Sequence, residues 1–255
     1  MTIRTHDGSV DHRAGGSVSV APRRPDERIA RFIARSLGGA RSVLNVGAGT
    51  GSYEGVGGTV TAVEPSAAMR ARRPRGRSVA VDAVAEDLPF ADGEFEAAMT
   101  LFSVHQWSDV TAGLREMRRV TRGPVTVLTC DPARVRDFWL DAYAPDVLDT
   151  EARRHPPVAE IAEALGGTIS VEAVPIPLDC TDAFNEAYYG RPEMLLDPAA
   201  RQPCSAWSFV GDDARERFDR TLRADLESGA WDERLGHLRT RPSYQGSLVV
   251  VRAVP

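Results

Sequence analysis

The chain has 255 residues, of which 42% are hydrophobic and 26% are charged, and these values indicate one large globular domain rather than two. The net charge of −5 argues against a general affinity for nucleic acid. Three cysteines without CxxC spacing argue against a disulfide framework or a zinc site. Because we find no apolar run of membrane-spanning length and no signal-peptide core, we expect a soluble, cytoplasmic protein that makes no membrane contact.

The chain begins with a polar, glycine-containing stretch and then alternates between strand and helix patterns. Residues 1–24 lack sustained periodicity, which predicts a flexible N-terminal arm, with a flap over bound ligand as the alternative. Apolar residues at helical spacing predict a first helix over 25–37. The strands that we expect after it cover 42–47, 59–64, 77–82, 95–102, 124–129, 168–176 and 244–254, and the helices cover 66–73, 108–121 and 157–165.

Strands separated by crossover helices predict an α/β fold with a mostly parallel sheet, helices on both faces, and a site at the carboxyl ends of the strands. Residues 25–255 are therefore expected to form one domain. Within it, residues 178–240 have a helical and aromatic character that interrupts the alternation. We interpret them as a helical insertion before the last strand that can cover the site.

The stretch VLNVGAGTGSYE ends an apolar strand in three alternating glycines. Such glycines let the backbone approach a ligand and direct N–H groups toward it. In the dinucleotide pattern G-x-G-x-x-G, Ser52 occupies the third glycine place after Gly47 and Gly49, while Gly51 comes one residue early. Glu64 ends the next strand, where a carboxylate can bind both hydroxyls of a ribose. Loop and acid together suit either NAD or S-adenosylmethionine.

Five motifs then resemble, in order and spacing, the class I S-adenosylmethionine-dependent methyltransferases of the methyltransferase type 11 group, and most of all a subgroup common in actinobacteria. They are VLNVGAGTGSYE, AVEPSAAM, AEDLPFADGEFEAAM, HQWSD and GLREMRRVTRGPVTVLT, between residues 41 and 130. The resemblance implies a Rossmann-like seven-stranded sheet whose seventh strand is antiparallel. It also implies S-adenosylmethionine as cofactor, S-adenosylhomocysteine as product, and a small-molecule methyl acceptor.

The resemblance further implies cofactor-binding roles for residues near the ends of the first four strands. These residues are Asn45, Gly47, Ala48, Gly49, Gly51, Glu64, Pro65, Ser66, Met69, Ala85, Glu86, Leu101, Phe102 and Ser103. Two positions depart from the family pattern. Asn45 replaces a frequent acid and supplies no anion toward the ammonium group of the cofactor. Val84 replaces an Asp that binds adenine in many relatives, which leaves Glu86 or Asp82 as substitutes.

Methyl transfer requires alignment of acceptor and methyl group, and it requires a base only when the acceptor must lose a proton. His105, just beyond the fourth strand, is the candidate base; the alternative is a structural His without a chemical role. Candidate substrate-binding residues, for most of which a role in the apolar core or in loop anchoring is the alternative, are Gln106, Trp107, Asp131, Trp139, Tyr143, Tyr188 and Tyr189. No acidic cluster with metal-site spacing is found near Asp131, so we expect no metal.

The leading hypothesis is methyl transfer from S-adenosylmethionine to a small molecule, with a possible place in specialised metabolism left open. A protein that binds the cofactor without transferring the methyl group is the first alternative. An NAD-dependent oxidoreductase is the second, and Ser52 together with the lack of any Lys for a Tyr-x-x-x-Lys pair counts against it. Neither the acceptor atom nor the oligomeric state is indicated by the sequence.

Overall fold

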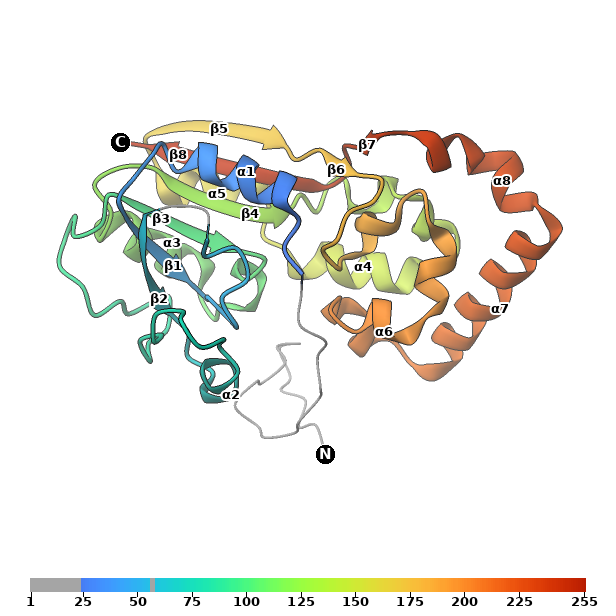
Figure 1. Cartoon of the computed structure of the whole chain (residues 1–255), viewed down its shortest axis with the longest axis horizontal. Helices are drawn as coiled ribbons and strands as arrows, with labels where there is room; N and C mark the ends of the chain where they lie inside the picture. The colour runs from blue at the N-terminus through green and yellow to red at the C-terminus, as the bar shows by residue number, and fades with distance from the viewer. Residues whose placement is uncertain (1–23, 56–57) are drawn as a thin grey trace.

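The computed structural model describes residues 24–55 and 58–255, so the predicted N-terminal arm lies almost entirely outside the described residues. Its centre is a six-stranded sheet in the order β2-β1-β3-β4-β8-β5 (Figure 1). The first four strands of this order run parallel, and β8 lies antiparallel to both of its neighbours. The strands are β1 Ser42–Val46, β2 Thr59–Val63, β3 Ala97–Leu101, β4 Val125–Cys130, β5 Thr168–Ala173 and β8 Leu248–Val254. The expected α/β fold with an antiparallel last strand is confirmed.

The apolar strand sequences bury both faces of the sheet because successive side chains point to opposite sides. In β1, Val43 belongs to one buried cluster and Leu44 to the other. Helix α1 (Glu27–Ser36) packs into the first cluster, whereas α3 (Val110–Arg119) and α5 (Val158–Leu165) pack into the second. The predicted helices on both faces are therefore present.

The sheet has six strands rather than the seven that we expected. Residues 77–82 form no strand and contribute only a parallel bridge between Val63 and Val81. This segment follows Pro74 and Gly76 at the edge of the sheet, and Val79 remains 91% exposed. Since Val79 is left uncovered by the elements of residues 24–55 and 58–255, extended pairing gains little burial there. The preceding helix is also short: α2 spans Ala67–Ala71.

The predicted strands on either side of the helical segment are shorter than their sequence patterns. The expected strand over 168–176 divides into β5 and β6 (Ile176–Pro177), and the last strand begins later than residue 244. The residues left over form a second, two-stranded sheet between β6 and β7 (Ser243–Tyr244). Strand pairing is therefore interrupted at both ends of the segment that we interpreted as an insertion.

Between β6 and β7 the chain is almost entirely helical. It contains α6 (Pro198–Arg201), α7 (Asp212–Ser228) and α8 (Ala230–Leu235), with 3₁₀ turns between them. Together with α4 (Pro145–Arg154), which the sequence patterns did not predict, these helices lie at the carboxyl end of the parallel strands (Figure 1). None of the helices in the described ranges has the length and apolarity needed to cross a membrane.

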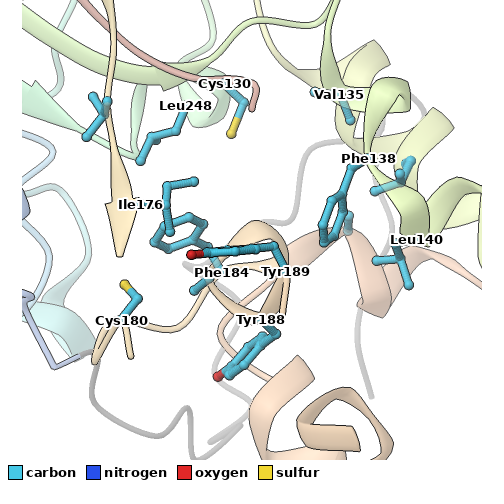
Figure 2. Close-up of a cluster of buried hydrophobic side chains, with 14 of the residues drawn as sticks. Cys130, Val135, Phe138, Leu140, Ile176, Cys180, Phe184, Tyr188, Tyr189 and Leu248 are labelled. Atoms are coloured by element: carbon cyan, nitrogen blue, oxygen red, sulfur yellow. The ribbon is translucent and has the colours of Figure 1, made fainter. Parts of the chain in front are cut away.

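An apolar cluster joins this helical region to the sheet. Figure 2 shows Phe138 and Tyr189 in this cluster together with Ile176, and Cys130 and Leu248 lie on the sheet side. All five side chains are buried. Because large buried aromatic rings contribute strongly to packing, this cluster fixes the helical region against the strand ends.

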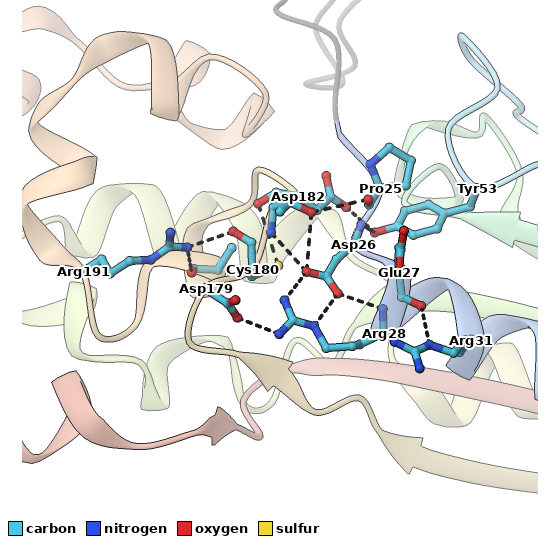
Figure 3. Close-up of polar contacts among 12 residues, drawn as sticks. Pro25, Asp26, Glu27, Arg28, Arg31, Tyr53, Asp179, Cys180, Asp182 and Arg191 are labelled. Atoms are coloured by element: carbon cyan, nitrogen blue, oxygen red, sulfur yellow. Dashed lines mark hydrogen bonds and ion pairs between the residues drawn. The ribbon is translucent and has the colours of Figure 1, made fainter.

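A polar cluster makes a second connection, between the start of α1 and residues 179–182 (Figure 3). Asp26 caps α1 by accepting a hydrogen bond from the Arg28 N–H at 2.9 Å, and it also accepts one from the Thr181 N–H at 3.2 Å. The Tyr53 hydroxyl donates to Asp182 at 2.7 Å. Tyr53 belongs to the glycine-rich loop, so this cluster links the loop to the helical region.

Candidate active site

A cavity of about 640 Å³ lies at the carboxyl ends of β1, β2, β3 and β4. The glycine loop after β1 and Glu64 after β2 form one end of its wall, and Cys130 at the end of β4 lies at the other. Cavities of this size and mixed polarity suit small molecules. Its position agrees with the expectation that the site lies at the carboxyl ends of the strands.

The glycine loop turns sharply because its backbone adopts left-handed conformations. Gly47 has φ +68°, and a Cβ atom at this position would lie 2.4 Å from the Ser103 hydroxyl oxygen. Gly49 also has positive φ, but no heavy atom stands within 4 Å of the place where its Cβ would lie. A side chain at position 47 would overlap Ser103, so this position requires glycine. At Gly49, by contrast, space beside the backbone is open.

Glu64 is held in a fixed orientation by two backbone donors. Its carboxylate oxygens accept hydrogen bonds from the N–H groups of Gly49 and Ser66, each at 2.8 Å. The residue is buried apart from a small surface in the cavity wall. A carboxylate oxygen can accept more than one hydrogen bond, so Glu64 retains acceptor capacity for two ligand hydroxyls.

Asn45 connects the cavity to a buried ion pair beneath the loop. Its amide nitrogen donates to Glu54 at 3.1 Å, and the other Glu54 oxygen pairs with Arg73 at 2.6 Å. The Oδ1 atom of Asn45 is buried and has no hydrogen-bond partner among the described residues. Since a buried acceptor without a partner is costly, this atom marks a place for a ligand donor.

Glu86 lies in the cavity wall, and one of its carboxylate oxygens is occupied by hydrogen bonds within the protein. Oε1 accepts from the Ser108 N–H and hydroxyl at 2.8 Å and from the Asp109 N–H at 2.9 Å. These donors immediately precede α3, so Glu86 orders the start of that helix. The neighbouring Ala85 and Val84 also line the cavity.

The end of β3 forms the wall between the glycine loop and the end of the cavity at Cys130. Phe102 has φ +55°, an unusual backbone conformation for a large side chain that is found mainly at functional sites. Ser103 donates to the Val46 carbonyl at 3.2 Å and lies 2.6 Å from the Thr100 hydroxyl. Leu101, Phe102 and Ser103, three of the residues expected to bind the cofactor, all line the cavity.

His105 faces the cavity and stacks on a second histidine that we did not predict. The ring centroids of His105 and His155 are 4.4 Å apart. Burial, followed by the nearby Arg154 charge, lowers the pKa of His155 to about 4, so this ring is neutral near pH 7. Gln106 and Trp107, two of the candidate substrate-binding residues, also line the cavity.

The end of the cavity at Cys130 contains three polar side chains that we did not predict: Glu151, Arg154 and His155. Glu151 and Arg154 lie three residues apart on one face of α4, and His155 follows as the residue that caps the end of this helix. The sequence EARRH carried this signal, and Pro145 at the helix start with Arg153 and Arg154 in the last turn indicated the helix.

Six candidate residues do not line the cavity in the part of the chain that the structure describes: Gly51, Asp131, Trp139, Tyr143, Tyr188 and Tyr189. Gly51 forms the underside of the loop turn, and its N–H donates to the Ala48 carbonyl. Asp131 closes a local turn by accepting from the Ala133 N–H. The four aromatic residues belong to the buried core, which was their alternative interpretation, and Tyr189 is fully buried. Asp131 and these four aromatic residues are therefore not part of the proposed substrate-binding site, and Gly51 supports the loop from outside the cavity.

Residues 44–126 match the family model described as "Methyltransferase domain". Over 155 residues, the chain is 36% identical to the demethylmenaquinone methyltransferase of Roseiflexus sp. (strain RS-1), covering 48% of this chain and 64% of that protein. It is 33% identical over 115 residues to the ubiquinone/menaquinone biosynthesis C-methyltransferase UbiE of Geobacter sp. (strain M21), covering 38% and 49%. The chain thus spans less than two thirds of these curated relatives.

Among solved structures, the chain resembles a protein of Anabaena variabilis ATCC 29413 that is described as a candidate methyltransferase from an antibiotic biosynthesis pathway. The TM-score is 0.83 and the identity 26%, with 91% of this chain and 98% of that chain covered. The [4+2]-cyclase SpnF has the same fold, with a TM-score of 0.52 and 19% identity over 90% of this chain and 81% of that chain. These likenesses show a Rossmann-like methyltransferase fold.

Proposed function

We propose that this protein is an S-adenosylmethionine-dependent methyltransferase that transfers a methyl group to a small-molecule acceptor. One observation carries the proposal: a single cavity joins the glycine loop, the Glu64 carboxylate and the orphaned Asn45 oxygen to a second end lined by histidine, glutamate and cysteine. The matched family model and the names of the relatives support the same activity. The subgroup common in actinobacteria remains a prediction from the sequence motifs.

The residues in the cavity fit the cofactor. Asn45 Oδ1 would accept a hydrogen bond from the ammonium group as an uncharged amide oxygen. The nearby Glu54 charge is already paired with Arg73. Glu64 would accept from the ribose hydroxyls, and Gly49 would leave room for close approach of the ligand. When bound, S-adenosylmethionine supplies an activated methyl group on a sulfonium.

The chain's own residues then have two tasks: to place the acceptor in line with the methyl group and to exclude water. Phe102 and Phe184, whose rings are 5.7 Å apart, form part of an apolar wall around the cavity. Residues 183–184 and 202–206 from the helical segment line the same cavity, which supports the proposal that this segment covers the site. His105 remains a candidate for the group that takes a proton from the acceptor.

Binding of S-adenosylhomocysteine, measured by isothermal titration calorimetry, tests this function. We expect micromolar binding, and we expect Glu64→Ala to weaken it by about 1 to 3 kcal/mol because hydrogen bonds to a charged carboxylate are lost. The exposed Glu172, on β5 outside the cavity, provides the control variant Glu172→Ala, which should bind normally. Absence of binding at high micromolar ligand would contradict the proposal.

Transfer itself needs a separate measurement, because a cofactor-binding protein without transfer activity would also pass the calorimetric test. The SpnF likeness illustrates that this fold also occurs in a protein named as a cyclase. In a cell extract that supplies candidate acceptors, labelled S-adenosylmethionine should lose its methyl label to a small-molecule fraction when the protein is added. Retention of all label in the cofactor, with normal binding, would favour the binding protein.

A further inference from the structure

We propose that Glu151 is the group that takes the proton from the methyl acceptor, with Asn185 and Cys130 holding its carboxylate toward the cavity. The acceptor class that this implies is a molecule whose nucleophilic atom carries a proton, such as a hydroxyl or an amine. This inference rests on the proposed methyl transfer and assigns a proton acceptor other than His105.

Hydrogen bonds fix the position of the Glu151 carboxylate. The Asn185 amide nitrogen donates to Oε2 at 2.7 Å, and the Cys130 thiol approaches Oε1 at 3.7 Å. Asn185 cannot reverse its amide group without loss, because its carbonyl oxygen accepts from the Trp207 indole N–H at 2.9 Å and an indole can only donate. The chain from Trp207 to Glu151 therefore presents both carboxylate oxygens in one orientation.

Among the described residues, the Glu151 carboxylate forms no salt bridge. Its exposed surface belongs to the cavity wall that also contains Cys130 and His105. Burial, the largest effect, raises the pKa of Glu151, and the hydrogen bonds from Asn185 and Cys130 together with the Arg154 charge oppose the rise. A carboxylate with a raised pKa is a better proton acceptor near neutral pH than an exposed one.

The other titratable groups around Glu151 are less suited to this task. Burial raises the pKa of the Cys130 thiol well above its usual range, so the thiol remains protonated and donates. His155 is neutral and stacked on His105, and Arg154 is a cation that donates to Ser205 at 2.7 Å. Glu186 is directed away from the cavity toward the backbone of Ser247 and Leu248. Among these groups, Glu151 is the carboxyl group that lines the cavity.

The proposed step balances in atoms and charge. A lone pair of the acceptor atom forms the new bond to the methyl carbon while the bond from that carbon to sulfur breaks, and its electrons remain on sulfur. The proton of the acceptor atom passes to a Glu151 oxygen, which later releases it to solvent. The products are methylated acceptor and neutral thioether.

Nuclear magnetic resonance of protein labelled with ¹³C at the glutamate carboxyl tests the assignment without requiring the acceptor. Glu151→Gln, which keeps the size of the side chain, identifies the Glu151 signal, and Glu163→Gln on the exposed face of α5 is the matched control. The signal is titrated against pH with saturating S-adenosylmethionine and again with S-adenosylhomocysteine. The two ligands differ by the methyl group and its positive charge.

If Glu151 faces the reacting centre, the positive sulfonium should lower its pKa by about one pH unit relative to the neutral thioether complex. Exposed glutamates should titrate identically in both complexes. Equal pKa values for Glu151 in the two complexes would overturn the inference while leaving the proposed function intact. Failure of both ligands to bind in calorimetry would instead contradict the proposed function, and Glu151 would lose its role with it.

A kinetic measurement gives a second, independent criterion once a panel of hydroxyl and amine acceptors yields turnover. We expect Glu151→Gln to lower kcat by about 10²-fold or more and to remove the loss of rate at low pH, with S-adenosylhomocysteine affinity unchanged. If His105→Asn removes that pH dependence and Glu151→Gln does not, His105 is the proton acceptor and the inference is wrong.

Discussion

A single amide side chain decides how charge is distributed at the glycine loop. Asn45 occupies the place where the resemblance led us to expect an acid, and its amide nitrogen hydrogen-bonds to Glu54. The structure therefore has an acid nine residues later, at Glu54. The charge of Glu54 is paired with Arg73 beneath the loop. A second carboxylate at position 45 would face Glu54 directly, which explains why an amide is suited to this position.

We predict that Asn45→Asp lowers the free energy of unfolding by about 1 to 3 kcal/mol near neutral pH, because two buried carboxylates would be in contact. The folded-state pKa of the new acid would be raised. Its cost is therefore small below about pH 4 and grows as the pH rises through that value. Urea unfolding at about pH 4 and pH 8 measures this difference.

The double variant Asn45→Asp/Glu54→Gln is the control for this prediction. It keeps one carboxylate for Arg73 and removes the like-charge contact, so it should recover part of the lost stability. A double-mutant cycle with both single variants gives the coupling between the two positions. A coupling of zero would show that the two side chains do not interact.

At the scale of elements, the buried carboxylate of Asp26 connects the N-terminal helix to residues 179–182. Asp26 caps α1 and also accepts from the Thr181 N–H, so it joins segments that are 155 residues apart. Desolvation by burial favours the neutral acid, but the hydrogen bonds from Arg28 and Thr181 outweigh it and lower the pKa of Asp26 to about 2. The charged form is therefore the stabilising one.

We predict that Asp26→Asn lowers the free energy of unfolding by about 1 to 3 kcal/mol at neutral pH, because hydrogen bonds to a charged acceptor are lost. Since the folded pKa lies below the unfolded value, the wild-type advantage is complete above about pH 4 to 5 and disappears as the pH falls toward 2. Urea unfolding of both proteins at about pH 7 and about pH 2 measures this difference in the free energy of unfolding.

Asp179→Asn is the matched control, because Asp179 pairs with the same Arg28 but its side chain is 80% exposed. Exposed ion pairs contribute little to stability, so this variant should lower the unfolding free energy much less than Asp26→Asn does. Equal losses from the two variants would mean that the Thr181 contact does not fasten the helix.

Over the whole molecule, the two regions meet at buried carboxyl groups. Glu186, in the helical region, accepts hydrogen bonds from the Ser247 and Leu248 N–H groups where the chain enters β8. Burial is the largest effect and raises the pKa of Glu186 to about 7, with the nearby Glu151 charge acting in the same direction. The contact between sheet and helical region therefore depends on pH.

We predict that the wild-type protein loses stability as the pH rises from about 4.5 through about 7, because the folded state binds protons that the unfolded state has released. Glu186→Gln should weaken this pH dependence, whereas Glu163→Gln on the surface should not. Urea unfolding at about pH 5 and pH 8 compares the three proteins. The same slope in wild type and Glu186→Gln would locate the titrating group elsewhere, with Glu151 as the next candidate.

The sequence by itself determined the parallel sheet and one end of the site, because both arise from local patterns. Apolar runs, glycines with special backbone angles and an acid at a strand end are set within a few residues of each other, so the loop and Glu64 could be predicted to meet. The same local patterns overestimated the strand over 77–82, since its failure to pair depends on what covers the sheet edge.

Only the tertiary structure decided which residues line the other end of the cavity, where Glu151 and Cys130 lie. The sequence suggested a pocket for the aromatic residues Trp139 and Tyr189, with the apolar core as the alternative, and burial against elements distant in sequence placed them in the core. Glu151 and Cys130 come from separate elements and meet with Asn185 only because α4 and the helical region fold over the end of β4. Such a meeting follows from long-range packing, which no local spacing encodes.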